Sequence, residues 1–366
     1  MENSITKLLR GTRIFYKLLN SKITGKRIPL VTNILVTNRC NLNCFYCFPQ
    51  VHGRKVRELT TKEILDVIDE SKKLGAEVII LLGGEPLLRE DIGIIIDHVK
   101  KRGLLCEVIT NGYFVEKWID YLKKVDSICI SIDGDEKGND KNRCPGSYKV
   151  TVRALKLARQ NGIFTRIHAV LTKYTINEKS IDHLVNLCRE LDTVATFAQP
   201  SEHTKHKAFN VSDKEFKKAF TKILEYKRKG YPIGNSEDAL KYIIKWPFPY
   251  DTIFKKGKTP KDFKPIKCQR KNLTCYIDTS GVVYPCAFLW EKCNITKINF
   301  LEKGFKEAWD SLDSFDCESC GVLTDMDLNL LLQLNLGALI NTGKYYIKDS
   351  LFKFKRKFKR NKHEEA

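Results

Sequence analysis

The feature that most constrains this chain is a group of three cysteines, Cys40, Cys44 and Cys47, in the short segment CNLNCFYC. The group follows an apolar run that is typical of a buried β-strand. Thiolates are the usual protein ligands of iron–sulfur clusters. Three of them on one loop can hold three irons of a cubane cluster and leave the fourth iron open to a chelating small molecule. A zinc site would require a fourth Cys or His nearby, so the missing fourth ligand favours a cluster with one open iron.

Strand-like and helix-like segments alternate over the first 200 residues or so. Short β-type runs lie at residues 33–37, 78–82, 107–110, 127–132, 166–171 and 194–198. Amphipathic helical patterns lie between them, at residues 61–74, 91–102, 115–124, 148–161 and 180–191. This alternation predicts parallel strands with right-handed crossovers. Six units are too few for a closed eight-fold barrel, so we expect an α/β fold with an open, partial barrel.

Several polar residues and glycines follow the predicted strands, at the end where such barrels place their sites. They are Gly83, Gly84, Glu85, Asn111, Ser131, Asp133 and Arg143. Two adjacent glycines allow a close backbone approach, and a carboxylate beside them could meet an ammonium group. Each signal is weak alone, because an Asn-Gly pair is usually a turn and a loop Arg is usually solvated. Their order at the ends of successive strands is what indicates a binding site.

Together, the cysteine loop and the strand-end residues resemble the radical S-adenosylmethionine (SAM) superfamily, whose fold is a partial (β/α)6 barrel. The resemblance implies a [4Fe-4S] cluster on the three cysteines and a bound SAM. It further implies that Tyr46 lies near the adenine, that Glu85 contacts the SAM amino group, and that Arg143 meets the carboxylate. The remaining implied SAM-binding positions are Gly83, Gly84, Asn111, Ser131 and Asp133.

The same resemblance implies reductive cleavage of SAM to a 5′-deoxyadenosyl radical, with electrons from a donor such as ferredoxin or flavodoxin. His168 departs from the pattern, because this family often supplies an apolar contact to adenine on the fifth strand. Ile167 or Val170 would take that role, and a lone strand His is more often structural. We assign no catalytic residue.

A second cysteine-rich segment contains Cys268, Cys275, Cys286, Cys293, Cys317 and Cys320, with a hairpin pattern around Ser280 and Gly281. It resembles the SPASM or twitch extension. That resemblance implies one auxiliary [4Fe-4S] cluster on Cys268, Cys286, Cys317 and Cys320. A structural zinc is the alternative. Cys275 and Cys293 are then spare thiols, alternative ligands or neighbours of an open site, and Cys144 is left unassigned.

These patterns divide the chain into five parts. We expect a basic amphipathic helix (1–30), the partial barrel (31–235), a linker (236–266), the auxiliary cluster domain (267–323) and a helical, basic tail (324–366). The formal net charge is +20. Residues 1–28 carry seven Lys/Arg and one acidic residue, and residues 341–366 carry nine and three. Over half of the excess charge therefore lies at the two ends, which points to terminal surface contacts rather than a basic catalytic groove.

The N-terminal helix would cap the barrel or lie on a membrane, and capping is the preferred interpretation. A solvated tail is preferred for residues 351–362, although their composition suits an anionic lipid surface or nucleic acid equally. No RNA-binding signature supports a nucleic-acid partner. We expect peptide or protein modification, because the SPASM-like family is often associated with it. A lipid or isoprenoid substrate, or a non-enzymatic electron carrier or sensor, are the alternatives.

Thirteen cysteines in a chain of this size do not indicate a disulfide framework, since they fall in tight clusters that fit metal better. We therefore expect a reducing, cytoplasmic setting, with peripheral membrane contact as an option for the basic ends. No run approaches the roughly 20 apolar residues that span a bilayer.

Overall fold

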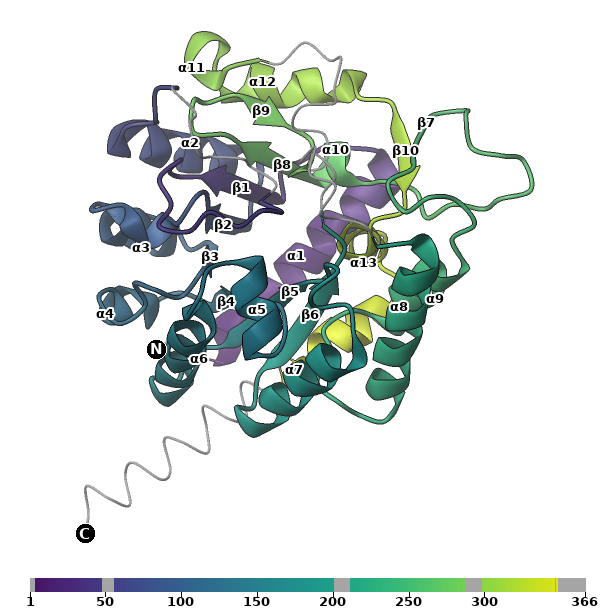
Figure 1. Cartoon of the computed structure of the whole chain (residues 1–366). Helices are drawn as coiled ribbons and strands as arrows, with labels where there is room; N and C mark the ends of the chain where they lie inside the picture. The colour runs from purple at the N-terminus through teal and green to yellow at the C-terminus, as the bar shows by residue number, and fades with distance from the viewer. Residues whose placement is uncertain (1–3, 48–55, 201–210, 288–297, 346, 348–366) are drawn as a thin grey trace.

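The computed structural model describes residues 4–47, 56–200, 211–287, 298–345 and 347 (Figure 1). Its centre is a curved sheet of eight strands in the order β6-β5-β4-β3-β2-β1-β8-β9. The first six are β1 (Val31–Leu35), β2 (Val78–Leu82), β3 (Leu105–Thr110), β4 (Ser127–Ser131), β5 (Thr165–Val170) and β6 (Val194–Ala198). Neighbouring strands among these six are parallel. The expected α/β fold with an open barrel is confirmed.

Helices cover the outer face of the sheet. They are α2 (Thr61–Leu74), α3 (Ile92–Lys101), α4 (Ile119–Leu122), α5 (Glu136–Asn142), α6 (Ser147–Gln160), α7 (Glu178–Glu190) and α8 (Asp213–Arg228). α2 shows why the sequence folds in this way: Thr60 and Glu63 form a capping box, and Gly75 ends the helix with a φ of 113°. The apolar sides of sheet and helices form one core, in which Ile34 and Ile79 are fully buried.

The hairpin around Ser280 and Gly281 is confirmed, and it extends the barrel sheet. β8 (Thr274–Ile277) pairs parallel to β1, and β9 (Val283–Tyr284) pairs antiparallel to β8. Gly281 has a φ of +95°, and its N–H donates to the Asp278 carbonyl at 3.0 Å. Strands from both cysteine-rich parts of the chain therefore share a single sheet.

The segment expected as a linker is structured. It contains α9 (Glu237–Lys245), whose Leu240 and Ile243 are buried against α8, and β7 (Ile253–Lys255). β7 pairs with β10 (Cys317–Cys320) in a separate two-stranded sheet. The remaining short elements are η1 (Pro86–Leu88), α10 (Arg270–Leu273), α11 (Phe300–Lys303), α12 (Phe305–Ser311), η4 (Leu312–Ser314) and α13 (Leu323–Leu332).

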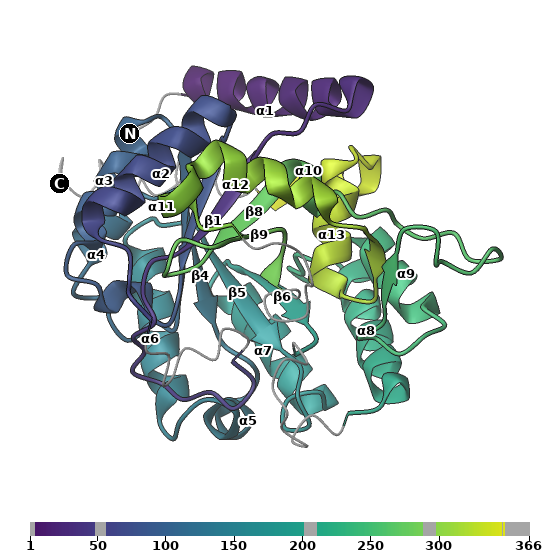
Figure 2. The same cartoon turned by 90° about the horizontal axis from the view of Figure 1, so that it is seen from above.

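The N-terminal helix α1 (Ser4–Thr24) lies across the ends at which the strands begin. Glu77 directly precedes β2 and accepts hydrogen bonds from Arg13 and Lys17, each at 2.5 Å. Asp126, which precedes β4, pairs with Arg10 of α1 at 3.6 Å. The strand-end residues of the candidate site lie at the opposite ends, so α1 closes the far end of the barrel (Figure 2). The capping interpretation of this helix agrees with these contacts. In the part of the chain that is described, no helix is both long and apolar enough to cross a membrane.

Candidate active site

The three-cysteine loop follows β1 directly. Cys40, Cys44 and Cys47 are each half-buried, and the Cys47 N–H donates to the Cys44 carbonyl at 3.1 Å. The Cys40 sulfur accepts from the Leu42 N–H at 3.4 Å. Burial raises the pKa of the Cys44 thiol to about 11, and the nearby Arg143 guanidinium opposes that rise. Burial also raises the pKa of Cys40, so at both thiols it outweighs the Arg143 charge, which favours the thiolate.

Gly83 and Gly84 bring the loop after β2 against the cysteine loop. The Gly84 N–H donates to the Thr37 carbonyl at 2.7 Å, and the Glu85 N–H donates to the Arg39 carbonyl at 2.8 Å. A Cβ on Gly84 would lie 2.3 Å from the Arg39 oxygen, and one on Gly83 would lie 2.5 Å from the Thr37 oxygen. The close approach that the two glycines allow is therefore to the chain leading into Cys40.

Glu85 is fully buried beneath this contact. Its carboxylate accepts from the Asn111 N–H at 2.7 Å, from the Thr110 hydroxyl at 2.7 Å and from the Leu87 N–H at 3.0 Å. Burial raises its pKa to about 7, although these hydrogen bonds act in the other direction. Among the described residues no cationic side chain forms an ion pair with Glu85. A buried carboxylate with three neutral donors and no counter-charge fits a ligand ammonium group.

Asp133 joins Tyr46 and Arg143 in one buried network at the end of β4. It accepts from the Tyr46 hydroxyl at 2.5 Å, from Arg143 Nη2 at 2.9 Å, from Asn142 Nδ2 at 3.1 Å and from the Val170 N–H at 3.0 Å. The Arg143 guanidinium also lies 5.5 Å from the centre of the Tyr46 ring. Both carboxylate oxygens of Asp133 are engaged within the protein, so this geometry suits a residue that positions Tyr46 and Arg143.

Two further observations support a polar ligand here. Arg143 Nε is buried and has no hydrogen-bond partner among the residues described. Asn38 lies two residues before Cys40, and both polar atoms of its side chain are likewise buried without a hydrogen-bond partner among the residues described. Buried polar groups are normally satisfied, so these atoms fit a site whose remaining partners come from bound SAM.

The barrel interior below these residues is polar. Arg166 donates to Glu107 from Nη2 at 2.6 Å and from Nε at 3.0 Å. His168 lies above this pair in the strand, opposite Ser131 in the β4–β5 register. Burial lowers the His168 pKa to about 4, so its imidazole is neutral at physiological pH. Ile167 is fully buried in the core between sheet and helices, which leaves Val170, on the same face as His168, as the better adenine contact of the two alternatives.

The sequence patterns missed three residues that hold the loop in place. Glu58 accepts from the Asn38 N–H at 2.6 Å and from the Thr37 hydroxyl at 2.9 Å. Arg89 is buried and donates to the Val36 carbonyl at 2.7 Å. Asn142, on α5, supports Asp133 as described above. None of them stands in a recognisable sequence motif.

The four cysteines expected in the auxiliary site lie together. The Cys317 thiol donates to Cys268, which lowers the pKa of Cys268. Cys320 is buried, which raises its pKa, and the charges of Cys268 and Cys286 raise it further. Cys286 packs against Cys317 beside Phe315. The surrounding β7–β10 pairing and the hydrogen bond from the Cys268 N–H to the Glu318 carbonyl, 2.7 Å long, fix this group.

A buried cation adjoins these cysteines. Arg270, ion-paired to Asp325 of α13, lowers the pKa of Cys268, as does the Asn329 side chain. Arg270 Nε is buried without a hydrogen-bond partner in the described part of the chain. Within the same residues, no three His, Cys, Asp or Glu side chains converge closely enough to hold a single ion.

The other cysteines have different surroundings. Cys275 is fully buried in β8, with its sulfur 3.8 Å from the Thr32 hydroxyl. Cys293 lies outside the described residues. Cys144 is half-buried beside Arg143, and its thiol lies 3.5 Å from the Pro145 carbonyl. Cys275 therefore belongs to the barrel core, and Cys144 lies at the rim of the candidate SAM site.

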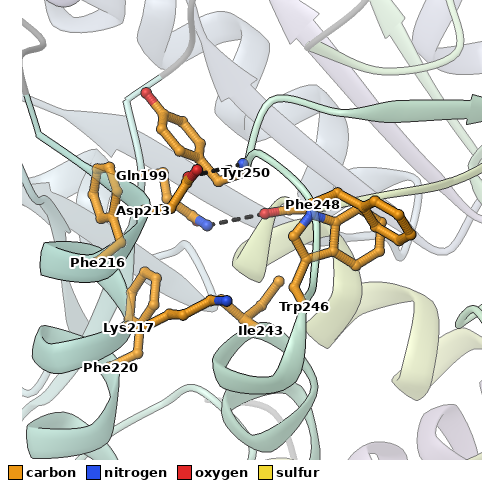
Figure 3. A pocket seen from close by; sticks show the side chains of 10 residues that line it. Gln199, Asp213, Phe216, Lys217, Phe220, Ile243, Trp246, Phe248 and Tyr250 are labelled. Carbon is orange, nitrogen blue, oxygen red and sulfur yellow. Dashed lines mark hydrogen bonds between the residues drawn. The ribbon is translucent and has the colours of Figure 1, made fainter.

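An aromatic contact between α8, α9 and the segment after α9 ties the two cysteine-bearing parts together (Figure 3). Gln199, which follows β6, donates from Nε2 to the Gly321 carbonyl at 2.9 Å, directly after Cys320. The Tyr250 N–H donates to Asp213 at 3.1 Å. The cavity that these residues line with Trp246 has a volume of about 10 Å³, which is room for one water at most. It is a packing feature and not a ligand site.

Comparison with known proteins assigns this architecture to a class. Residues 34–188 match the family model of the Radical SAM superfamily. The chain is 30% identical over 172 residues to a probable GTP 3′,8-cyclase of Pyrobaculum aerophilum, covering 45% of this chain and 56% of that protein. It is 26% identical over 297 residues to an AdoMet-dependent heme synthase of Nitratidesulfovibrio vulgaris, covering 76% and 78%. Alignment to the first relative thus spans little more than half of that relative's length.

A solved structure has a similar fold. The chain superposes on Streptococcus suis SuiB bound to S-adenosylmethionine with a TM-score of 0.63 and 20% identity, covering 80% of this chain and 68% of that one. SuiB bound to precursor peptide SuiA gives a TM-score of 0.62 at the same identity, with coverages of 84% and 70%. Residues 34–188 form a radical SAM domain. The superfamily uses a [4Fe-4S] cluster and SAM.

Proposed function

We propose that this protein cleaves SAM reductively at a [4Fe-4S] cluster held by Cys40, Cys44 and Cys47, and that it modifies a peptide or protein. The observation that carries the first part is Glu85, a buried carboxylate without a cationic partner among the described residues, beside the three-cysteine loop. A cluster held by these three cysteines would supply the single electron that reductive cleavage of SAM requires.

The protein's own residues bind and orient SAM in this proposal. Glu85 would hold the ammonium group, and Arg143 would hold the carboxylate through Nε, which has no other partner in the described chain. Asp133 keeps both Arg143 and Tyr46 in place through its two oxygens. Gly83, Gly84, Asn111 and Ser131 border the same space, and the neutral His168 lies on the barrel wall below it.

We further propose that Cys268, Cys286, Cys317 and Cys320 hold an auxiliary [4Fe-4S] cluster. Their mutual contacts and the adjacent Arg270, which would offset the charge of several thiolates, support this proposal. The four cysteines and their cluster would form the centre of a SPASM-like extension. A reduced ferredoxin or flavodoxin is the expected electron donor.

The peptide assignment is supported by the likeness to SuiB, whose structure contains a precursor peptide. At 20% identity that likeness is one of fold, so the substrate must be sought by experiment. Purified protein, reconstituted with iron and sulfide without oxygen, should be incubated with SAM, reduced flavodoxin and peptides encoded near its gene. We expect 5′-deoxyadenosine and a mass change in one peptide. Mass changes in a lipid extract instead would support the lipid or isoprenoid alternative.

Iron counting tests the two clusters separately. We expect about eight irons in the reconstituted chain. Cys44→Ala should remove about half of them and abolish 5′-deoxyadenosine formation, and Cys320→Ala should remove the other half. The auxiliary cluster would be contradicted if the unchanged chain held one zinc and only about four irons, and if Cys320→Ala removed that zinc. Unchanged SAM cleavage in Cys44→Ala would contradict the main proposal and favour another role for the chain.

A further inference from the structure

The outward face of α1 is apolar. Leu9, Tyr16 and Ile23 are seven residues apart, so they lie along one side of the helix. Their exposed fractions are 63%, 67% and 75%. Leu19 lies beside them and is also exposed, whereas Leu18 on the opposite side is buried against the barrel. The side of α1 that packs on the protein thus combines Leu18 with ion-paired basic residues, and the apolar row is turned to solvent.

A second helical segment, residues 336–345, adds to this surface. Its Leu336 and Ile340 are exposed. Asn341 Nδ2 donates to the Gly234 carbonyl at 2.6 Å, and Gly234 donates to Ala195 at the start of β6. This segment therefore covers the same end of the barrel as α1. The two are linked where Lys22 donates to the Gln333 carbonyl at 3.1 Å.

The charge around the surface has one sign. α1 contains no acidic residue in its 21 positions and has five basic ones. Arg10, Arg13 and Lys17 are paired with barrel carboxylates, whereas Lys22 is exposed at the edge of the outward side. In the sequence, residues 351–362 include seven Lys/Arg and three Phe. An apolar row with basic flanks is typical of helices that lie in the interface of an anionic bilayer.

We propose that this surface, the terminal face formed by Leu9, Tyr16, Leu19, Ile23, Leu336 and Ile340, binds an anionic lipid bilayer without crossing it. The inference goes beyond the proposed function and does not depend on it. Apolar side chains and a polybasic segment are two separate signals, and stable anchoring generally takes two. A second copy of the chain suits this surface less well, because face-to-face contact would bring two sets of basic residues together.

Docking by the terminal face would also fix how the candidate site is oriented relative to the bilayer. Cys40, Glu85 and Arg143 follow the far ends of the strands, so the candidate site would open away from the bilayer. A substrate and an electron donor in the aqueous phase would reach it freely. This orientation supports a peptide over a lipid as the substrate.

Vesicle flotation of the full, reconstituted chain tests the proposal. We expect it to float with vesicles of phosphatidylcholine and phosphatidylglycerol, to float poorly with phosphatidylcholine alone, and to dissociate at high salt. Tyr16→Glu and Ile23→Glu should each weaken binding about tenfold, since each puts a carboxylate in place of an apolar contact with an anionic surface. Both side chains are exposed, so iron content and circular dichroism should not change.

Ile94→Glu, on α3, is the matched control, because Ile94 is 57% exposed on another side of the barrel. It should bind vesicles as the unchanged chain does. Absence of binding to anionic vesicles, or equal binding by Ile23→Glu and the unchanged chain, would overturn the proposal. Light scattering could instead show that the unchanged chain is a dimer, that Ile23→Glu is a monomer, and that neither binds vesicles. That result would identify a second copy of the chain as the occupant and would also overturn the bilayer proposal.

Discussion

Glu85 shows how one residue combines structural and chemical roles. Its carboxylate fixes the end of β3 through Thr110 and Asn111. The same burial that makes these bonds strong also raises its pKa to about 7. A group with that pKa changes its charge within the physiological range, and only its ionised form attracts an ammonium group.

We therefore expect SAM affinity to depend on pH through Glu85. Because the neutral form prevails below its pKa, affinity should rise roughly tenfold between about pH 6 and pH 8. Glu85→Gln should bind SAM weakly and with little change over this range. Equilibrium dialysis of the reconstituted protein at three pH values measures both effects.

Glu90→Gln is the control for this prediction, because the Glu90 side chain is 80% exposed and lies in the same loop region. It should keep the affinity and the pH dependence of the unchanged chain. If Glu85→Gln retained the same rise with pH, another group would be responsible.

At the scale of elements, the packing of the β2 loop on the cysteine loop is the decisive contact. Gly84 has no space for a side chain, since a Cβ would lie 2.7 Å from the Arg39 carbonyl carbon, which is backbone and cannot rotate away. Gly84→Ala should therefore displace the chain before Cys40. We expect loss of most of the iron held by the first cluster, measured as iron per chain and by electron paramagnetic resonance after reduction.

Gly11→Ala provides the comparison. Gly11 lies within α1, and a Cβ there would meet nothing within 4 Å. The iron content of Gly11→Ala should equal that of the unchanged chain. Full iron content and SAM affinity in Gly84→Ala would show that the loop tolerates the displacement.

The elements themselves were largely predictable. β2, β6 and α2 have the bounds expected from the sequence, because apolar periodicity reports directly on burial. α5 was missed, since its sequence EKGNDKN has no apolar face and its helix is held by tertiary contacts of Asn139 and Asn142. α9 was missed because nearby Pro and Lys residues resemble a connector. Local sequence composition is a poor predictor of helices that are stabilised mainly by tertiary contacts.

The site was predictable in membership but not in arrangement. Motif spacing indicated Glu85, Asp133 and Arg143, yet it could not show that Asp133 is saturated by Tyr46 and Arg143. Glu58 and Arg89 were not found, because their roles depend on contacts with the backbone of Asn38 and Val36, which no side-chain pattern reveals. The grouping of the four auxiliary cysteines agreed with the spacing.

For the whole molecule, Glu77 links α1 to the barrel. It is fully buried, and the effect of burial on its pKa is outweighed by hydrogen bonds from Arg13 and Lys17, so the pKa is lowered. Glu77→Gln should lower the free energy of unfolding by about 1.5–3 kcal/mol, the range for hydrogen bonds to charged groups. Urea unfolding followed by circular dichroism measures this, together with the rate at which a protease removes α1.

The sign of the pH effect follows from the lowered pKa. Glu77 contributes its stability above the ordinary carboxyl pKa of 4.5 and loses it as the pH falls through the lower value of the folded state. The difference between the unchanged chain and Glu77→Gln should thus shrink in acid. Glu116→Gln, at an exposed pair with Arg153, should show no such difference, and a gap that widened in acid would refute the assignment.

The anchoring of the cysteine loop has a consequence for assembly of the enzyme. Asn38 and Arg39 are held by Glu58 and by the chain after Gly84, through contacts that involve no thiol. The path into Cys40 is thus set by folding alone. If the three cysteines hold a cluster, we therefore expect that iron and sulfide can be delivered to the folded chain without unfolding it.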